Sequence, residues 1–269
     1  MSEKVKGTLL IIGGAEDRKG KCLILKRFVE LAGGEKGRLV VITAATAEPQ
    51  TSGEVYHSLF QGLGVQDVAV LNLNTRQDTG APGAREALEQ ATGIFFTGGD
   101  QLRLTSILGG TQVDDALHTA YLQGTIIAGT SAGASAMSET MIVDGEETEA
   151  PRKNTVQMAP GLGLLHEVVV DQHFAQRGRL GRLLAAVAQN PYVLGLGIDE
   201  DTAIIVSPDG TFEVVGSHTV TVIDGKQLWE TNVSATSSHE PLAMTNVILH
   251  VLPAGYGFDM ETRTPFHNK

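Results

Sequence analysis

Short apolar runs, each followed by a helical pattern, alternate along the first half of this 269-residue chain. The runs are apolar throughout rather than alternating with polar residues, so both faces of each strand are expected to be buried. This pattern is typical of a parallel sheet covered by helices on both sides. The expected strands are 8–12, 38–43, 68–71, 93–97 and 125–128, and the expected helices are 21–31, 52–63, 85–91, 101–108 and 113–122.

The last third of the chain has a different pattern, which predicts antiparallel strands. Segments 203–206 and 211–215 flank Ser207-Pro208-Asp209-Gly210, a hairpin turn sequence. Neither an internal repeat nor a low-complexity linker divides the chain, so we expect one catalytic domain over residues 1–269. The predicted fold class is α/β, with a mostly parallel central sheet flanked by helices. The remaining expected elements are strands 167–171, 220–223 and 247–251 and a helix over 179–189.

Composition excludes several classes of function. Lys and Arg total 20 against 31 Asp and Glu, and the resulting net charge of −11 argues against binding to nucleic acid or an anionic membrane surface. Cys22 is the one cysteine, which excludes an internal disulfide. The chain has no apolar run long enough to cross a membrane and no signal-peptide pattern at its start, so we expect a cytoplasmic enzyme.

No cofactor or metal is expected from the sequence. The His, Cys and carboxylate residues do not recur at the spacing of metal ligands. Gly13-Gly14 follows an apolar strand but lacks the Gly-x-Gly-x-x-Gly pattern of a nucleotide site, and Glu16-Asp17 would repel phosphate.

The pentapeptide Gly129-Thr130-Ser131-Ala132-Gly133 is the one Gly-x-Ser-x-Gly in the chain. An apolar strand leads into it, and a helical pattern over 132–137 follows. This strand, turn and helix predict a nucleophile elbow, in which glycines leave room for a tight turn that exposes the serine hydroxyl. Ser131 is therefore the candidate nucleophile.

Two further glycine turns end neighbouring strands. Gly13-Gly14 and Gly98-Gly99 lie at the carboxyl ends of expected parallel strands, as does Gly129, so one crevice could be lined by all three turns. An oxyanion hole needs backbone N–H donors, one of them from the residue after the nucleophile, Ala132. We expect Gly99 to supply the second donor, with Gly13-Gly14 as the reserve.

His173 is the candidate general base. It comes just after the strand 168–170, at a carboxyl end where it could face Ser131. The residue that orients it stays open from spacing. Glu149 lies in the acidic loop between the elbow and His173, while Asp171, Glu200 and Asp201 lie at strand ends.

Three segments in order resemble the S51 serine peptidases: Phe96-Thr97-Gly98-Gly99-Asp100-Gln101, Gly129-Thr130-Ser131-Ala132-Gly133-Ala134 and Asp171-Gln172-His173-Phe174. The resemblance extends from Gly13-Gly14 to the C-terminal tail. It implies a class I glutamine amidotransferase-like fold in which serine replaces the cysteine nucleophile. It also implies that Ser131 is the nucleophile, His173 the base and Glu149 the acidic member.

The resemblance further implies a serine exopeptidase that releases β-Asp-Arg dipeptides from cyanophycin, multi-L-arginyl-poly-L-aspartate. This polymer carries a guanidinium and a free α-carboxylate on each unit, and arginine binds carboxylates through two parallel hydrogen bonds. The resemblance also implies a homodimer. The residues that it places in the substrate pocket are Gln101, Asp171, Gln172, Arg177, Arg179 and Arg182.

Two other functions remain open on the sequence. One is an α-aspartyl dipeptidase with the same catalytic residues, which has less need of the arginines at 177, 179 and 182. The other is a catalytically silent binding protein on the same fold, against which the intact set of Ser131, Glu149 and His173 argues.

Overall fold

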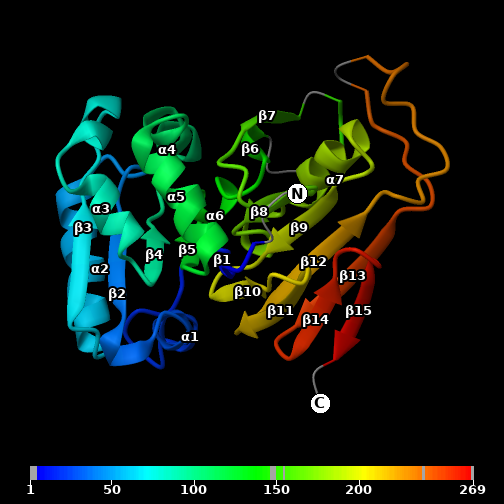
Figure 1. Cartoon of the computed structure of the whole chain (residues 1–269). Coiled ribbons are helices and arrows are strands. Elements are labelled where there is room, and N and C mark those ends of the chain that lie inside the picture. The colour runs from blue at the N-terminus through cyan, green and yellow to red at the C-terminus, as the bar shows by residue number, and fades with distance from the viewer. Residues whose placement is uncertain (1–4, 146–149, 154, 238–239, 268–269) are drawn as a thin grey trace.

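The computed structural model describes residues 5–145, 150–153, 155–237 and 240–267. Within these ranges, nine strands form the main sheet, which runs across the molecule in Figure 1. Its order is β15-β14-β11-β10-β1-β5-β4-β2-β3. The strands are β1 (Leu9–Ile12), β2 (Arg38–Ile42), β3 (Asp67–Leu71), β4 (Gly93–Phe96), β5 (Ile126–Thr130), β10 (Thr202–Val206), β11 (Thr211–Gly216), β14 (Tyr256–Asp259) and β15 (Thr264–His267).

The direction of these strands confirms the predicted α/β class. Neighbours from β1 to β3 pair in parallel, whereas β10, β11, β14 and β15 extend the sheet by antiparallel pairing. The predicted hairpin joins β10 to β11, and its turn closes with a hydrogen bond from the Ser207 amide to the Thr211 carbonyl.

A second sheet, with the order β13-β12-β9-β8, was not distinguished from the first by the sequence. Strands β8 and β9 are parallel, and β12 and β13 add antiparallel pairs. A separate two-stranded sheet pairs β6 and β7 antiparallel, on either side of the acidic loop noted in the sequence. The strands are β6 (Thr140–Gly145), β7 (Val156–Pro160), β8 (Val168–Gln172), β9 (Leu194–Ile198), β12 (Thr219–Asp224) and β13 (Ile248–Pro253).

Helices cover both faces of the parallel part of the main sheet. Alternate strand residues point to opposite faces, so Leu10 and Ile12 pack with α1 and α2 while Leu9 and Ile11 pack with α3, α4, α5 and α6. The helices are α1 (Leu23–Leu31), α2 (Pro49–Gly62), α3 (Ala84–Glu89), α4 (Gln101–Leu108), α5 (Gln112–Gln123), α6 (Ala132–Ser135) and α7 (Leu180–Gln189), and short 3₁₀ helices are η1 (Gly34–Lys36), η2 (Arg76–Gly80) and η3 (Ala175–Arg177).

The second sheet lies between the antiparallel half of the main sheet and α7. One of its faces shares a core with β10 and β11, and the other packs against Leu183 and Val187 of α7. Because β8 belongs to this second sheet, His173 reaches Ser131 from a different layer and not from a neighbouring strand. The carboxyl ends of β1, β5 and β4, which are adjacent, point toward the same region.

Close packing around the elbow leads to the first prediction. A Cβ added at Gly133 would lie 2.7 Å from both the Cβ and the carbonyl oxygen of Phe96, which is closer than side chains approach. We expect Gly133→Ala to lower the free energy of unfolding by about 1–3 kcal/mol through this overpacking. Chemical denaturation of the variant and the wild type measures the change.

Gly62→Ala is the matched control. Gly62 is the last residue of α2 and has no atom within 4 Å of an added Cβ, and alanine is the better helix former. The control should be as stable as the wild type or more stable. Equal stability of Gly133→Ala and the wild type would contradict the packing described here.

Candidate active site

Ser131 occupies a strained turn between β5 and α6. Its φ of 53° and ψ of −112° are rarely adopted by a residue with a side chain, and such conformations persist where the surroundings fix them. The Ser131 amide donates to the carbonyl of Ile12, at 3.0 Å, which ties the turn to β1. A Cβ at Gly129 would lie 2.5 Å from the Gly133 carbonyl oxygen, so the turn can close this tightly only around glycine.

The predicted oxyanion donors are the backbone amides of Ala132 and Gly99. Ala132 is the first residue of α6, and the first amides of a helix have no acceptor within it. Gly99 follows β4 and has a φ of 144°, and a Cβ there would lie 2.2 Å from the Ala45 carbonyl oxygen. Gly99 lines the same cavity as Ser131.

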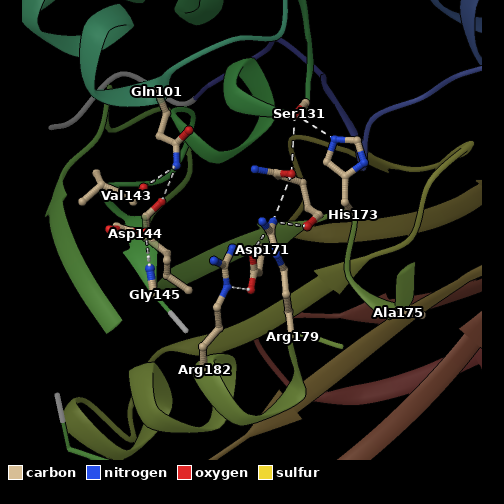
Figure 2. A network of polar contacts seen from close by, with 12 residues as sticks. Gln101, Ser131, Val143, Asp144, Gly145, Asp171, His173, Ala175, Arg179 and Arg182 are labelled. Atoms are coloured by element: carbon tan, nitrogen blue, oxygen red, sulfur yellow. Dashed lines mark hydrogen bonds and ion pairs between the residues drawn. The ribbon is translucent and has the colours of Figure 1, made fainter. Parts of the chain in front are cut away.

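His173 lies between the serine and a carboxylate. Its Nε2 is 3.0 Å from Ser131 Oγ, the contact drawn as a dashed line in Figure 2, and its Nδ1 is 2.6 Å from Glu200 Oε1. An ionised carboxylate only accepts hydrogen bonds, so Nδ1 carries the proton in this arrangement and Nε2 is free to accept one from Ser131. The His173 amide also donates to the Gly13 carbonyl, at 2.8 Å, which anchors the residue to the first glycine turn.

The carboxylates that the sequence left as candidates for orienting His173 lie in different places. Glu200 contacts His173, and its own amide donates to Gln176 Oε1, at 3.0 Å. Asp201 instead accepts from the Asp17 amide and the Ser217 hydroxyl. Glu149, the acid that the family resemblance implied, lies outside the described residues.

Asp171 is buried and held by two arginines. Its carboxylate accepts from Arg182 Nε at 2.7 Å and from a terminal nitrogen of the same guanidinium, and Arg179 approaches at 3.4 Å. All three side chains are at most 6% exposed. Figure 2 shows Asp171 between the two arginines. Gln172 Oε1 accepts from Arg179 at 3.2 Å and lies 3.5 Å from Ser131 Oγ.

A cavity of about 350 Å³ opens beside Ser131 and gathers most of the predicted substrate-binding residues. Asp171 lies behind its wall, where it holds the arginines. Gln101 donates to the carbonyls of Ile142 and Val143 and so ties β6 to the rim of the cavity. The lining residues are Gly99, Gln101, Ser131, Val143, Asp144, Gly145, Gln172, Arg177, Arg179 and Arg182.

From the sequence, Glu16 was expected only to repel phosphate. The structure buries Glu16 beneath the Ser131 turn, where Thr130 Oγ1 and the Tyr56 hydroxyl donate to its carboxylate at 2.5 and 2.6 Å. Burial raises the pKa of Tyr56, and the neighbouring Glu16 carboxylate raises it further. Tyr56 therefore stays a protonated hydrogen-bond donor to Glu16 at neutral pH. The position of Glu16 just after the Gly13-Gly14 turn was the one signal in the sequence that could have placed it here.

The described residues hold neither a metal-binding cluster nor a membrane-spanning helix. Within those ranges, His, Cys, Asp and Glu residues form no group of three or more that could hold a metal ion. None of the helices in the same part of the chain is long and apolar enough to span a membrane.

The chain is similar to one protein family, to named relatives and to a solved structure. The family model described as peptidase family S51 matches residues 9–214. A protein named cyanophycinase from Trichormus variabilis is 41% identical over 97% of this chain and 88% of its own length. Another of the same name from Geminocystis herdmanii is 40% identical over 98% of both chains. The crystal structure of a peptidase from an acI-B1 Actinobacterium shares the fold, with a TM-score of 0.68 and 23% identity over 96% of this chain and 98% of that one.

The buried pair of Asp171 and Arg182 yields the prediction of this subsection. Asp171→Asn removes the carboxylate that pairs with the buried guanidinium of Arg182, and we expect the free energy of unfolding to fall by about 3–5 kcal/mol. Asp67→Asn is the control, because its partner Arg38 and Asp67 itself are about half exposed and such a pair contributes at most about 1 kcal/mol. Denaturant titration of both variants checks this, and equal losses would contradict it.

Proposed function

The chain belongs to peptidase family S51, and we propose that it is a serine-type exopeptidase that hydrolyses cyanophycin to β-Asp-Arg dipeptides. The observation that carries this proposal is the continuous contact from Ser131 Oγ through His173 to Glu200. The relatives named cyanophycinase support the substrate, because they are 40–41% identical to this chain over nearly its whole length. The family expected from the three sequence segments is confirmed.

In the proposed reaction Ser131 is the nucleophile, and the turn that carries it is a nucleophile elbow. His173 Nε2 takes the proton of the Ser131 hydroxyl, and the oxygen attacks an aspartyl backbone carbonyl. The amides of Ala132 and Gly99 bind the oxyanion that forms. His173 then gives its proton to the leaving amine, and the acyl group remains on Ser131. Water that is activated by His173 next releases the acyl group and restores the hydroxyl.

Glu200 is the acidic member of the triad in this proposal. A hydrogen bond of 2.6 Å from Nδ1 to its carboxylate holds the imidazole in the tautomer that accepts the serine proton. The same carboxylate stabilises the imidazolium that forms during attack. Glu149, which the resemblance implied for this role, is the alternative acid.

The arginine-lined cavity is the proposed subsite for the acyl unit of the polymer. Each cyanophycin unit carries a free α-carboxylate, which matches the guanidinium groups of Arg177, Arg179 and Arg182. Asp171 holds two of these guanidinium groups in place and is itself neutralised by them. Asp144 is an exposed carboxylate on the cavity wall, and we assign it to the guanidinium of the substrate. Gln101 and Gln172 supply further polar contacts at the rim.

The wider organisation of the protein is also part of the proposal. We propose that residues 1–269 form one catalytic domain, that the protein is a homodimer, and that it acts in the cytoplasm without nucleic acid, membrane or cofactor. The free, buried thiol of Cys22 is compatible with a reducing compartment. Light scattering on the purified protein measures its oligomeric state. Fractionation of cells measures its location.

Product analysis tests the proposed substrate. Purified protein incubated with insoluble cyanophycin should release soluble β-Asp-Arg, identified by mass, because the triad and the cavity suit this amide bond. Ser131→Ala should release none, since it lacks the hydroxyl that forms the acyl-enzyme. Release by Ser131→Ala near the wild-type rate would contradict the nucleophile assignment. Cleavage of Asp-X dipeptides without release from the polymer would favour the α-aspartyl dipeptidase.

A pair of conservative variants tests the acidic member. Glu200→Gln should lower kcat on cyanophycin by about 10²–10⁴-fold, because the amide no longer fixes the tautomer or stabilises the imidazolium. Glu149→Gln is the matched control and should keep kcat within a few-fold of wild type. Steady-state kinetics of dipeptide release measures both. A large loss in Glu149→Gln with little change in Glu200→Gln would transfer the role to Glu149.

A further inference from the structure

Ser131 lines two cavities, and the proposed subsite for the acyl unit occupies one of them. The second, of about 230 Å³, lies toward the ends of β1 and α2 and shares Ser131 with the arginine-lined cavity. A peptidase nucleophile needs space on both sides of the scissile bond, one for the acyl unit and one for the leaving amine. The lining residues are Ala15, Glu16, Arg18, Ser52, Tyr56, Gly98, Thr130 and Ser131.

The position of His173 indicates which cavity faces the leaving group. In the proposed mechanism His173 Nε2 protonates the departing amine, so that amine must lie beside the imidazole ring. Gly14 approaches this ring so closely that an added Cβ would lie 2.4 Å from Nε2. Ala15 and Glu16 continue directly from Gly14 into the wall of the second cavity. A leaving group on this side therefore passes the proton donor as it departs.

Arg18 is the cation of this cavity. Its Nε lies 3.8 Å from Glu16 Oε1, and its guanidinium stacks 5.7 Å from the centre of the Tyr56 ring. The Arg18 side chain is 46% exposed, and among the described residues its guanidinium makes no hydrogen bond. A guanidinium has five N–H donors in a planar fork that matches a carboxylate.

Glu16 holds Arg18 in position but accepts no hydrogen bond from its N–H groups. Both oxygens of the Glu16 carboxylate already accept from hydroxyl groups, those of Tyr56 and Thr130. The remaining contact with Arg18 is longer than a hydrogen bond, so it holds the guanidinium near the cavity through charge alone. Glu16 and the Tyr56 ring thus orient the Arg18 guanidinium, and its N–H groups stay available to a ligand.

We infer that the second cavity binds the leaving β-Asp-Arg unit and that Arg18 recognises a carboxylate of that unit. This inference rests on the proposed function. The unit that leaves from the C-terminal end carries two such groups, the chain-end carboxylate of its aspartate and the α-carboxylate of its arginine. Binding of the chain-end group would also explain an exopeptidase, because an internal unit has an amide at that position.

The test uses a synthetic dimer of β-Asp-Arg units, which has one scissile backbone amide and therefore one defined leaving unit. Three versions are compared: the free dimer, one with the chain-end carboxylate converted to a carboxamide, and one with the leaving arginine's α-carboxylate converted instead. In the wild type, amidation of the recognised carboxylate should lower kcat/KM by about 10–100-fold, the range for a charge-assisted hydrogen bond. We call this fall in kcat/KM the penalty. The carboxamide version that shows it identifies the carboxylate that is recognised.

The same comparison in Arg18→Ala isolates the contact, because the penalty is a ratio within one enzyme. We expect the penalty to fall below about twofold, since the partner of the carboxylate is gone. Arg18→Gln, which keeps side-chain length and loses the charge, gives an independent measurement of the same ratio. Arg27→Ala is the matched control: Arg27 is an exposed arginine of α1 whose partner is Glu30, and its variant should keep the wild-type penalty.

The outcomes separate this inference from the proposed function. A penalty that persists in Arg18→Ala and Arg18→Gln, or no penalty in the wild type with either carboxamide, would overturn the role of Arg18 alone. A wild-type protein that cleaves neither the free dimer nor the polymer overturns both proposals together.

Discussion

The close approach of the two sheets at Gly13-Gly14 is the constraint on which the site depends. A Cβ at Gly13 would lie 2.1 Å from the Asp199 carbonyl oxygen, and one at Gly14 would meet the His173 ring. The Gly13 carbonyl accepts from the His173 amide, and the Gly14 carbonyl accepts from the Asp201 amide. One turn of the main sheet thereby fixes the ends of β8 and β9, which carry the imidazole and Glu200.

Charge divides the space around Ser131 into two different environments. On one side, three arginines line the cavity and a buried aspartate holds two of them. On the other side, Arg18 lies over a buried glutamate whose oxygens are occupied by hydroxyl donors. In both places a buried carboxylate positions a cation that borders the nucleophile. This shared arrangement suits a substrate that carries a free carboxylate on every unit.

Local signals predicted the parallel strands, the Ser131 turn and the placement of His173, because apolar runs and glycine turns leave a strong pattern over few residues. The second sheet was not predicted, since the strand at 168–172 has the same apolar pattern whichever sheet it joins. Glu200 remained one of several candidates for the same reason: a carboxylate 27 residues from its histidine leaves no local mark. The sequence indicated only the charge of Glu16 and not its burial, because its partners Tyr56 and Thr130 come from distant elements.

Labelling with a fluorophosphonate, followed by peptide mass mapping, tests whether His173 activates Ser131 as a nucleophile. Such a probe reacts with a serine hydroxyl that an adjacent base has activated. We expect one modified peptide, which contains Ser131, and a labelling rate that falls steeply in His173→Ala because the base is lost. A label on another serine, or an unchanged rate in His173→Ala, would contradict the claim that His173 activates Ser131.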